Sequence, residues 1–121
     1  MLTADTRIGI EGDFKICPPE TAISMNIPRV LQELTAARVS PQHLTAAVVQ
    51  SKSFDPRGAK EAGFLDEVVA KDALDDRVTE LGQQLAQLPA RFYDQNKQDL
   101  RRNSLRIMQE EVDAFKKAVG L

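Results

Sequence analysis

Cysteine, histidine and aromatic residues are scarce in this chain. It contains one cysteine (Cys17), one histidine (His43) and no tryptophan. A single cysteine cannot form a disulfide within the chain, and this usage is typical of proteins from a reducing, cytoplasmic compartment. The few possible metal ligands are otherwise scattered carboxylates, so we expect no metal site and no cofactor.

Long apolar runs and an excess of one charge are also missing. No apolar run approaches the roughly 20 residues that a bilayer span needs, and the segment Met1–Asp5 lacks the basic and apolar parts of a secretory signal. Lys and Arg number 16 against 18 Asp and Glu, a net charge of −2, with the signs intermixed. A nucleic-acid surface would need a clustered basic face. We therefore expect a cytoplasmic protein with neither a membrane nor a nucleic-acid partner.

The 121 residues suffice for one modest core, which begins with strand-like sequence. Polar and apolar residues alternate over Thr6–Ile10, and Glu11–Asp13 resembles a turn into a second short strand, Phe14–Ile16. These two strands would form a hairpin or a ββ unit. A further strand is predicted at Phe64–Val69, where it would return to the sheet.

Helix start and stop signals fill the space between these strands. They predict helices that begin at Pro28 and Pro41, and a short third helix over Arg57–Ala62, after Asp55 and before Gly63. Strands separated by helices indicate an α/β fold.

The C-terminal part of the sequence is helical throughout. Two apolar stripes recur at intervals of three and four residues: Leu74, Val78, Leu81, Leu85 and Leu88, and then Leu105, Met108, Val112, Phe115 and Val119. Such stripes are typical of helices that pack against a core or a second subunit. We therefore divide the chain into a core region, 1–70, and a helical oligomerisation region, 71–121.

One carboxylate stands out by its surroundings. Glu20 follows Pro18 and Pro19, which end the preceding strand, and an almost uncharged run follows it as far as Pro28. A carboxyl group held out of water in such a segment can transfer protons to and from a substrate. Glutamates in loops after strands are nevertheless more often solvated, or cap the next turn, so the residue type alone favours no chemistry.

Several segments together resemble the enoyl-CoA hydratase/isomerase, or crotonase, family. The resemblance rests on Ala4-Asp5-Thr6-Arg7-Ile8-Gly9, Phe14-Lys15-Ile16, Pro19-Glu20, Ile27-Pro28 and Lys60-Glu61-Ala62-Gly63-Phe64-Leu65-Asp66-Glu67-Val68-Val69. It implies a partial crotonase-like ββα spiral followed by a C-terminal helical region. It also implies that the chain corresponds to the C-terminal half only, without both oxyanion-hole amides of the family.

The resemblance further implies a substrate and site residues. Members bind an acyl-CoA thioester and stabilise its enolate by backbone N–H groups, while a carboxylate moves the proton. By motif, Glu20 would be the catalytic acid/base. The other implied substrate contacts are Ile23, Met25 and Ile27 at the acyl group and Phe115 and Lys116 near the nucleotide. For the apolar residues, plain core packing is an equally good interpretation. A homo-oligomer, a trimer or hexamer, is implied as well.

Two departures from the family pattern concern glycine. Ser24 stands where hydratases commonly carry glycine, and Arg29–Gln32 replaces a glycine-rich segment. These differences leave the reaction subtype open. They also leave three hypotheses: an acyl-CoA enzyme that is active only with the other half of the fold, a non-catalytic remnant that serves as an oligomerisation module, or a helix-rich interaction domain whose likeness is accidental.

Overall fold

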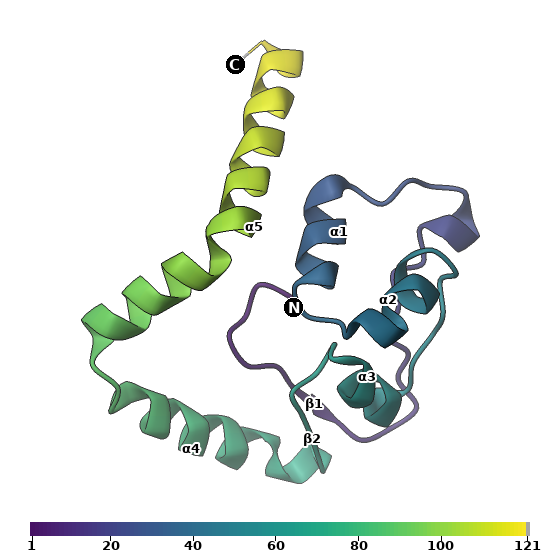
Figure 1. Cartoon of the computed structure of the whole chain (residues 1–121). Coiled ribbons are helices and arrows are strands. Elements are labelled where there is room, and N and C mark those ends of the chain that lie inside the picture. Colours follow the sequence, from purple (N-terminus) through teal and green to yellow (C-terminus); the bar gives the residue numbers. More distant parts are fainter. Residues whose placement is uncertain (121) are drawn as a thin grey trace.

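A computed structural model of the chain describes residues 1–120 (Figure 1). Two short strands and five α-helices make up its regular structure, with two 3₁₀ turns, η1 and η2. In chain order the elements are β1 (Ile8–Ile10), η1 (Thr21–Ile23), α1 (Arg29–Ala36), α2 (Pro41–Val48), α3 (Pro56–Ala62), β2 (Glu67–Val69), η2 (Lys71–Ala73), α4 (Leu74–Ala86) and α5 (Ala90–Val119). The α/β class predicted from the sequence is confirmed.

The two strands pair in parallel, not as a hairpin. Gly9 of β1 lies opposite Val68 of β2, and helices α1 to α3 form the crossover between the strands. The predicted hairpin between Thr6–Ile10 and Phe14–Ile16 is therefore wrong. Ile16 instead makes a single antiparallel bridge with Phe54, through hydrogen bonds of 2.9 and 3.0 Å. Local alternation could not reveal this, because the partner of a parallel strand is remote in sequence.

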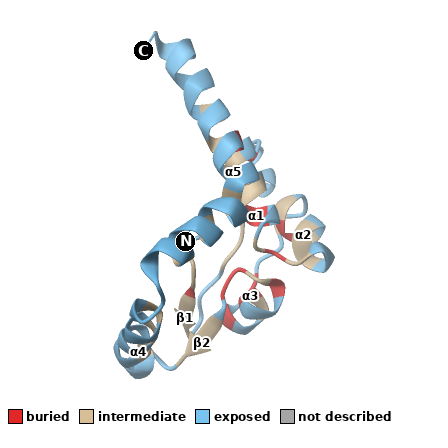
Figure 2. Ribbon diagram, turned by 60° about the vertical axis from the view of Figure 1, so that its left-hand side comes forward, coloured by how far each residue is buried: buried red, intermediate tan, exposed pale blue. Residues whose placement is uncertain are grey.

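The hydrophobic core lies between α2, α3 and the segment leading into β2. Figure 2 shows the buried positions on this side of the molecule, whereas α4 and α5 are largely exposed. The cluster comprises Val39, Ala47, Phe54, Ala59, Ala62, Phe64 and Leu65. Many of these side chains are small or contributed by loops, so the helices approach one another closely around Phe54 and Phe64, whose rings lie 5.6 Å apart.

Helix α3 has the ends that the sequence predicts. The Asp55 carboxylate accepts a hydrogen bond of 2.7 Å from the Gly58 amide, which is a standard N-cap. Gly63 ends the helix with φ +96°, a left-handed conformation that favours glycine. The chain then turns directly into the buried pair Phe64 and Leu65.

The last two helices leave the core at an angle. Helix α4 is tied to β2 by Arg77, which donates two hydrogen bonds of 2.7 Å to Glu67. Helix α5 crosses α1, and its buried residue is Ile107. Its C-terminal turns then extend beyond the other elements (Figures 1 and 2). The predicted helices 71–121 are thus present, but their apolar stripes are only partly covered.

Candidate functional site

The site is built on the loop between the Ile16 bridge and α1. Two consecutive prolines, Pro18 and Pro19, prevent the chain from continuing along Phe54. The backbone then makes one 3₁₀ turn, η1, in which the Ile23 amide donates to the Glu20 carbonyl at 3.1 Å; the Met25 amide, beyond the turn, donates to the same carbonyl at 2.8 Å. Ser24 ends the turn with φ +59°, in the left-handed region. The loop thus presents Glu20 at the start of η1.

Glu20 faces an open, mainly apolar groove of about 340 Å³. Its Oε2 atom is buried and has no hydrogen-bond partner, the sole buried side-chain nitrogen or oxygen of residues 1–120 in that condition. The lining comprises Met1, Leu2, Thr3, Ile16, Cys17, Pro18, Pro19, Ile27, Leu31, Leu34, Thr35 and Phe64 besides Glu20, which contributes its one charged side chain. A carboxyl oxygen without a partner is costly to bury, so it marks a position where a ligand proton or polar atom can bind.

The residues predicted from the sequence are only partly gathered at this groove. Ile27, which is buried, lines the groove together with Glu20. Ile23 and Met25 are 57% and 59% exposed and do not line it. Phe115 and Lys116 are exposed on the C-terminal turns of α5. Their roles stay predictions.

Sequence reasoning missed most of the groove walls. Leu2 and Thr3 come from the N-terminal segment, Leu34 and Thr35 from α1, and Phe64 from the turn after α3. The buried Thr35 hydroxyl donates to the Leu31 carbonyl at 2.7 Å, so its proton is not free to bind a ligand in the groove. No sequence signal brings these segments together, because their contact depends on how α1 packs over the crossover.

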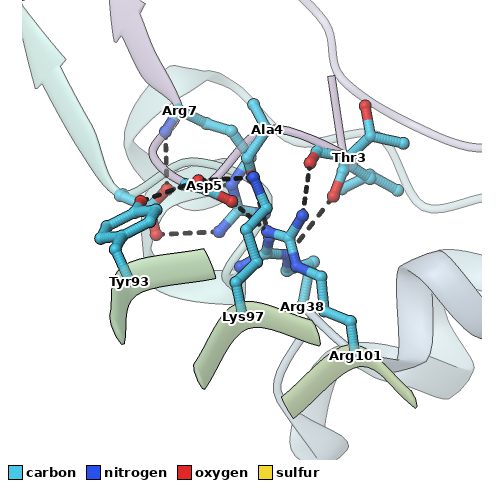
Figure 3. A network of polar contacts seen from close by, with 10 residues as sticks. Thr3, Ala4, Asp5, Arg7, Arg38, Tyr93, Lys97 and Arg101 are labelled. Carbon is cyan, nitrogen blue, oxygen red and sulfur yellow. Dashed lines mark hydrogen bonds and ion pairs between the residues drawn. The ribbon is translucent and has the colours of Figure 1, made fainter. Parts of the chain in front are cut away.

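A polar cluster holds the N-terminal segment in place beside α5 (Figure 3). Asp5 accepts hydrogen bonds from Tyr93 at 2.7 Å, Lys97 at 2.8 Å and Arg101 at 2.6 Å. The hydrogen bond from Lys97 is the largest cause that holds the pKa of Asp5 below its ordinary value. The hydrogen bond from Tyr93 and the charge of Arg101 lower this pKa further. The same contact with Asp5 raises the pKa of Tyr93.

The backbone of that segment is bonded as well. Arg101 donates to the Thr3 carbonyl at 2.9 Å, and Arg38 donates to the Ala4 carbonyl at 2.7 Å and to the Leu2 carbonyl at 3.3 Å. Two guanidinium groups, Arg38 from the turn after α1 and Arg101 from α5, therefore fix the wall that Leu2 and Thr3 contribute to the groove.

Arg7 connects the same segment to the entrance of β2. Its buried guanidinium donates to Asp66 at 2.9 and 2.8 Å and to the Gly63 carbonyl at 2.9 Å. The Arg7 amide also donates to Asp66 at 2.7 Å. These bonds, first of all those from the Arg7 side chain, hold the pKa of Asp66 below its ordinary value.

Other kinds of site find little support among the described residues. Within residues 1–120 no three His, Cys, Asp or Glu side chains gather as a metal site would require. None of the helices in this part of the chain is long and apolar enough to cross a membrane. Among the side chains that line the groove, the Glu20 carboxylate is a candidate for proton transfer.

Solved structures share this fold closely, whereas sequence comparisons find nothing. No protein-family profile and no curated protein matches the chain. An enoyl-CoA hydratase/isomerase family protein from Pseudomonas syringae superposes with a TM-score of 0.90 at 29% identity, over 96% of this chain and 50% of that one. A probable enoyl-CoA hydratase from Mycobacterium tuberculosis gives 0.88 at 25% identity, over 99% of this chain and 50% of the other.

A more distant structure agrees in fold. Human mitochondrial delta3-delta2-enoyl-CoA isomerase gives a TM-score of 0.86 at 21% identity, over 93% of this chain and 44% of that one. The chain thus spans about half the length of the solved chains that it matches. The resemblance found in the sequence is confirmed: this chain has the crotonase-like fold of enoyl-CoA hydratase/isomerase family proteins, over one half of their length.

Proposed function

We propose that this chain carries the acid/base half of a site that hydrates or isomerises an enoyl-CoA thioester. The observation that carries the proposal is the buried, unpartnered Oε2 atom of Glu20 in an apolar groove. The structural relatives named as enoyl-CoA hydratases and isomerases supply the reaction class. The substrate is the acyl-CoA itself, and the proposal includes no further cofactor.

The groove suits the proton-transfer step. A thioester with its acyl carbons against Ile27, Leu31 and Phe64 would lie beside the Glu20 carboxylate. In isomerisation the carboxylate would take a proton from one carbon and return it to another; in hydration it would take a proton from a water molecule whose oxygen adds to the β carbon, and the α carbon would receive a proton. An acyl chain bound in this open, mainly apolar groove would displace water from around that carboxylate. The enolate oxygen needs backbone N–H donors, which the resemblance assigns to the other half of the fold. We therefore propose that turnover requires that half, and that residues 1–121 alone are inactive. A cytoplasmic location is part of the same proposal.

The test combines this chain with the half of a solved relative that this chain does not cover. Residues 1–121 are assayed with crotonyl-CoA alone and after mixing with a polypeptide covering the remaining half of the Pseudomonas syringae relative. We expect turnover only in the mixture, and a loss of at least about 100-fold for Glu20→Gln, which keeps the shape of the side chain but cannot transfer the proton. Glu61→Gln, an exposed acid on α3, is the control and should keep full activity.

Two results would contradict the proposal. Equal turnover by Glu20→Gln and wild type would remove Glu20 from the chemistry. Failure of the mixture to bind any acyl-CoA in calorimetry would remove the thioester substrate.

A second candidate function is an oligomerisation module without catalysis. The observation that favours it is the uncovered apolar surface of α5, where Val112, Phe115 and Val119 are 47%, 64% and 51% exposed. Large exposed apolar side chains in a row mark association surfaces. If this is the function, the Glu20 variants would leave assembly unchanged and no acyl-CoA would bind.

A further inference from the structure

The turn that follows Glu20 has little packing of its own. Residues 21–26, which form η1 and the segment after it, are all exposed. A single 3₁₀ turn is a weak element, because its hydrogen bonds have poorer geometry than those of an α-helix. Segments with few buried contacts also open locally at little cost in free energy. The direction in which this turn presents Glu20 therefore depends on contacts with other elements.

Two hydrogen bonds attach η1 to the end of α2. The Thr21 hydroxyl donates to the Val48 carbonyl at 3.3 Å. The Ala22 amide donates to the Ser51 hydroxyl oxygen at 3.1 Å. Both bonds join residues next to Glu20 in sequence with a segment 27 and 29 residues further along the chain.

The other side of the Glu20 loop is held by the same segment. Ile16 forms its antiparallel bridge with Phe54, three residues after Ser51. The loop is thus tied to residues 48–54 before Glu20 and again directly after it. Residues 48–54 therefore act as the support on which Glu20 is presented.

Ser51 has an unusual backbone for a serine. Its φ is +51°, and it shares a left-handed conformation with Ser24, at φ +59°, among the non-glycine residues of 1–120. It follows α2, and the next residue, Lys52, donates its amide back to the Ala46 carbonyl at 2.9 Å. Glycine is the usual residue at such a helix end, because a Cβ crowds the following carbonyl.

The two strained serines flank the same turn. Ser24 ends η1, and Ser51 accepts a hydrogen bond from it. Backbone strain of this kind clusters at functional sites, where it persists because the surroundings hold it. At position 51 a glycine would suit the backbone better, but it has no side-chain oxygen to accept the Ala22 amide.

We propose that Ser51 is a positioning residue for Glu20: its hydroxyl oxygen holds the Ala22 amide, and this bond fixes the direction in which the Glu20 carboxylate enters the groove. The inference rests on the proposed function, because it concerns the geometry of the proposed acid/base. Precise placement matters for such a group, since a misplacement of about 1 Å can cost roughly 100-fold in rate.

The first measurement does not depend on catalysis. In residues 1–121, hydrogen exchange of the Ala22 amide and the NMR resonance of the Glu20 carboxyl carbon are compared between wild type, Ser51→Ala and Ser51→Gly. Both variants should exchange roughly fivefold faster at Ala22, because one hydrogen bond is lost. Both should also shift the Glu20 resonance. Ser53→Ala, an exposed serine two residues along the same segment, is the matched control and should change neither.

The second measurement is turnover of crotonyl-CoA in the mixture with the other half of the fold. Both Ser51 variants should lower kcat by at least about tenfold with KM little changed, because the groove walls stay in place. Ser51→Gly should nevertheless unfold at a higher temperature than Ser51→Ala, since the left-handed conformation favours glycine. An equal loss of kcat at different stability is the mark of positioning rather than of support for the fold.

Two further variants sharpen the assignment. Thr21→Val removes the other bond between η1 and α2, and it should act on the Glu20 resonance and on kcat in the same direction as the Ser51 variants. The double variant Ser51→Ala/Glu20→Gln should be no slower than Glu20→Gln alone, because a residue that acts through Glu20 has no effect without it. An unchanged circular dichroism spectrum shows that each variant is folded.

The outcomes separate this inference from the proposed function. Full activity of both Ser51 variants, or a loss of kcat that follows stability and is smaller for Ser51→Gly, overturns the role of Ser51 and leaves that of Glu20 intact. If the wild-type mixture is inactive, the proposed function fails. The exchange and resonance data then decide alone whether Ser51 fixes the carboxylate, and an unchanged Glu20 resonance in both variants overturns the inference.

Discussion

Arg7 shows how much one side chain can organise in a small core. It is 6% exposed, and its guanidinium bridges Asp66 and the Gly63 carbonyl, which lie on either side of the turn into β2. A buried guanidinium is tolerated only when its donors are satisfied, and here the partners are a carboxylate and a carbonyl at fixed positions. The N-terminal segment and the β2 entrance are thereby joined across 59 residues of sequence.

The contact of Arg7 with Asp66 predicts a dependence of stability on pH. The folded-state pKa of Asp66 lies below its ordinary value of 3.8, so the unfolded state binds more protons between these two values. Stability is therefore present above about pH 4 and is lost as the pH falls through the lowered pKa. Asp5, whose pKa is also lowered, contributes with the same sign.

The variant Asp66→Asn tests this. It should lower the free energy of unfolding by roughly 1–2 kcal/mol at pH 7, toward the lower end for a charged hydrogen bond because the Asp66 side chain is 39% exposed. The difference from wild type should shrink in urea unfolding curves recorded from pH 6 down to pH 2.5. Asp13→Asn, an exposed aspartate in the turn after β1, is the control. A constant difference over this range would show that the charge of Asp66 plays no part.

Ser24 carries a side chain although its backbone conformation favours glycine. Its φ of +59° belongs to a region that costs a non-glycine residue about 1 kcal/mol or more. The departure from the family glycine noted in the sequence therefore falls at a position where glycine would relieve strain. The turn keeps its shape because neighbouring bonds hold it: Thr21 donates to the Val48 carbonyl at 3.3 Å, and the Ala22 amide donates to Ser51 at 3.1 Å.

At the scale of elements, the end of α3 determines how the chain enters the sheet. Gly63 has φ +96°, and a Cβ at this position would lie 2.4 Å from the Arg38 carbonyl oxygen. Arg38 directly precedes Val39, which belongs to the hydrophobic core. The close approach of α3 to the turn after α1 thus depends on the missing side chain of Gly63.

Substitution at Gly63 is expected to destabilise the protein. Gly63→Ala should lower the free energy of unfolding by about 3 kcal/mol, from the left-handed conformation and the clash together. Gly82→Ala, in the exposed middle of α4 with no atom within 4 Å of the added Cβ, is the matched control and should raise stability by roughly 0.5–1 kcal/mol. Chemical unfolding of both variants decides the matter. If Gly63→Ala changed the free energy of unfolding in the same way as Gly82→Ala, the backbone around Gly63 would be able to shift at little cost.

Helix α5 depends on polar contacts more than on burial. Ile107 is its buried residue, while Tyr93, Lys97 and Arg101 bind Asp5 (Figure 3). These three lie four residues apart along one face, so a single carboxylate holds three turns of the helix. This contact ties α5 to the N-terminal segment, in addition to its direct packing on α1.

At the scale of the whole molecule, the uncovered part of α5 predicts self-association. The sequence predicted an interface at the stripe from Leu105 to Val119. In the structure Met108 is half-buried and lines a pocket between α1 and α5, whereas the stripe beyond it has no covering element among residues 1–120. Whether the assembly is a trimer or a hexamer stays a prediction from the resemblance.

Light scattering at micromolar concentration tests the interface. Residues 1–121 should give a mass above that of the monomer, 13.4 kDa. Phe115→Glu should shift the mass toward the monomer, because it places a charge in an apolar contact. Lys117→Glu, two residues along the same exposed helix, should change the mass little. A clean monomer for wild type would contradict the prediction.

Local signals in the sequence determined the helices, several of their ends and the family likeness. The Asp55 cap and Gly63 act within one turn of the chain, where steric and hydrogen-bonding preferences decide. Tertiary structure alone decided the pairing of β1 with β2, the walls around Glu20 and the pocket between α1 and α5. These features join segments 50 to 100 residues apart, such as Asp5 with Arg101, 96 residues along the chain. Such contacts form only where packing brings the segments together, and no pattern within either segment encodes the partner.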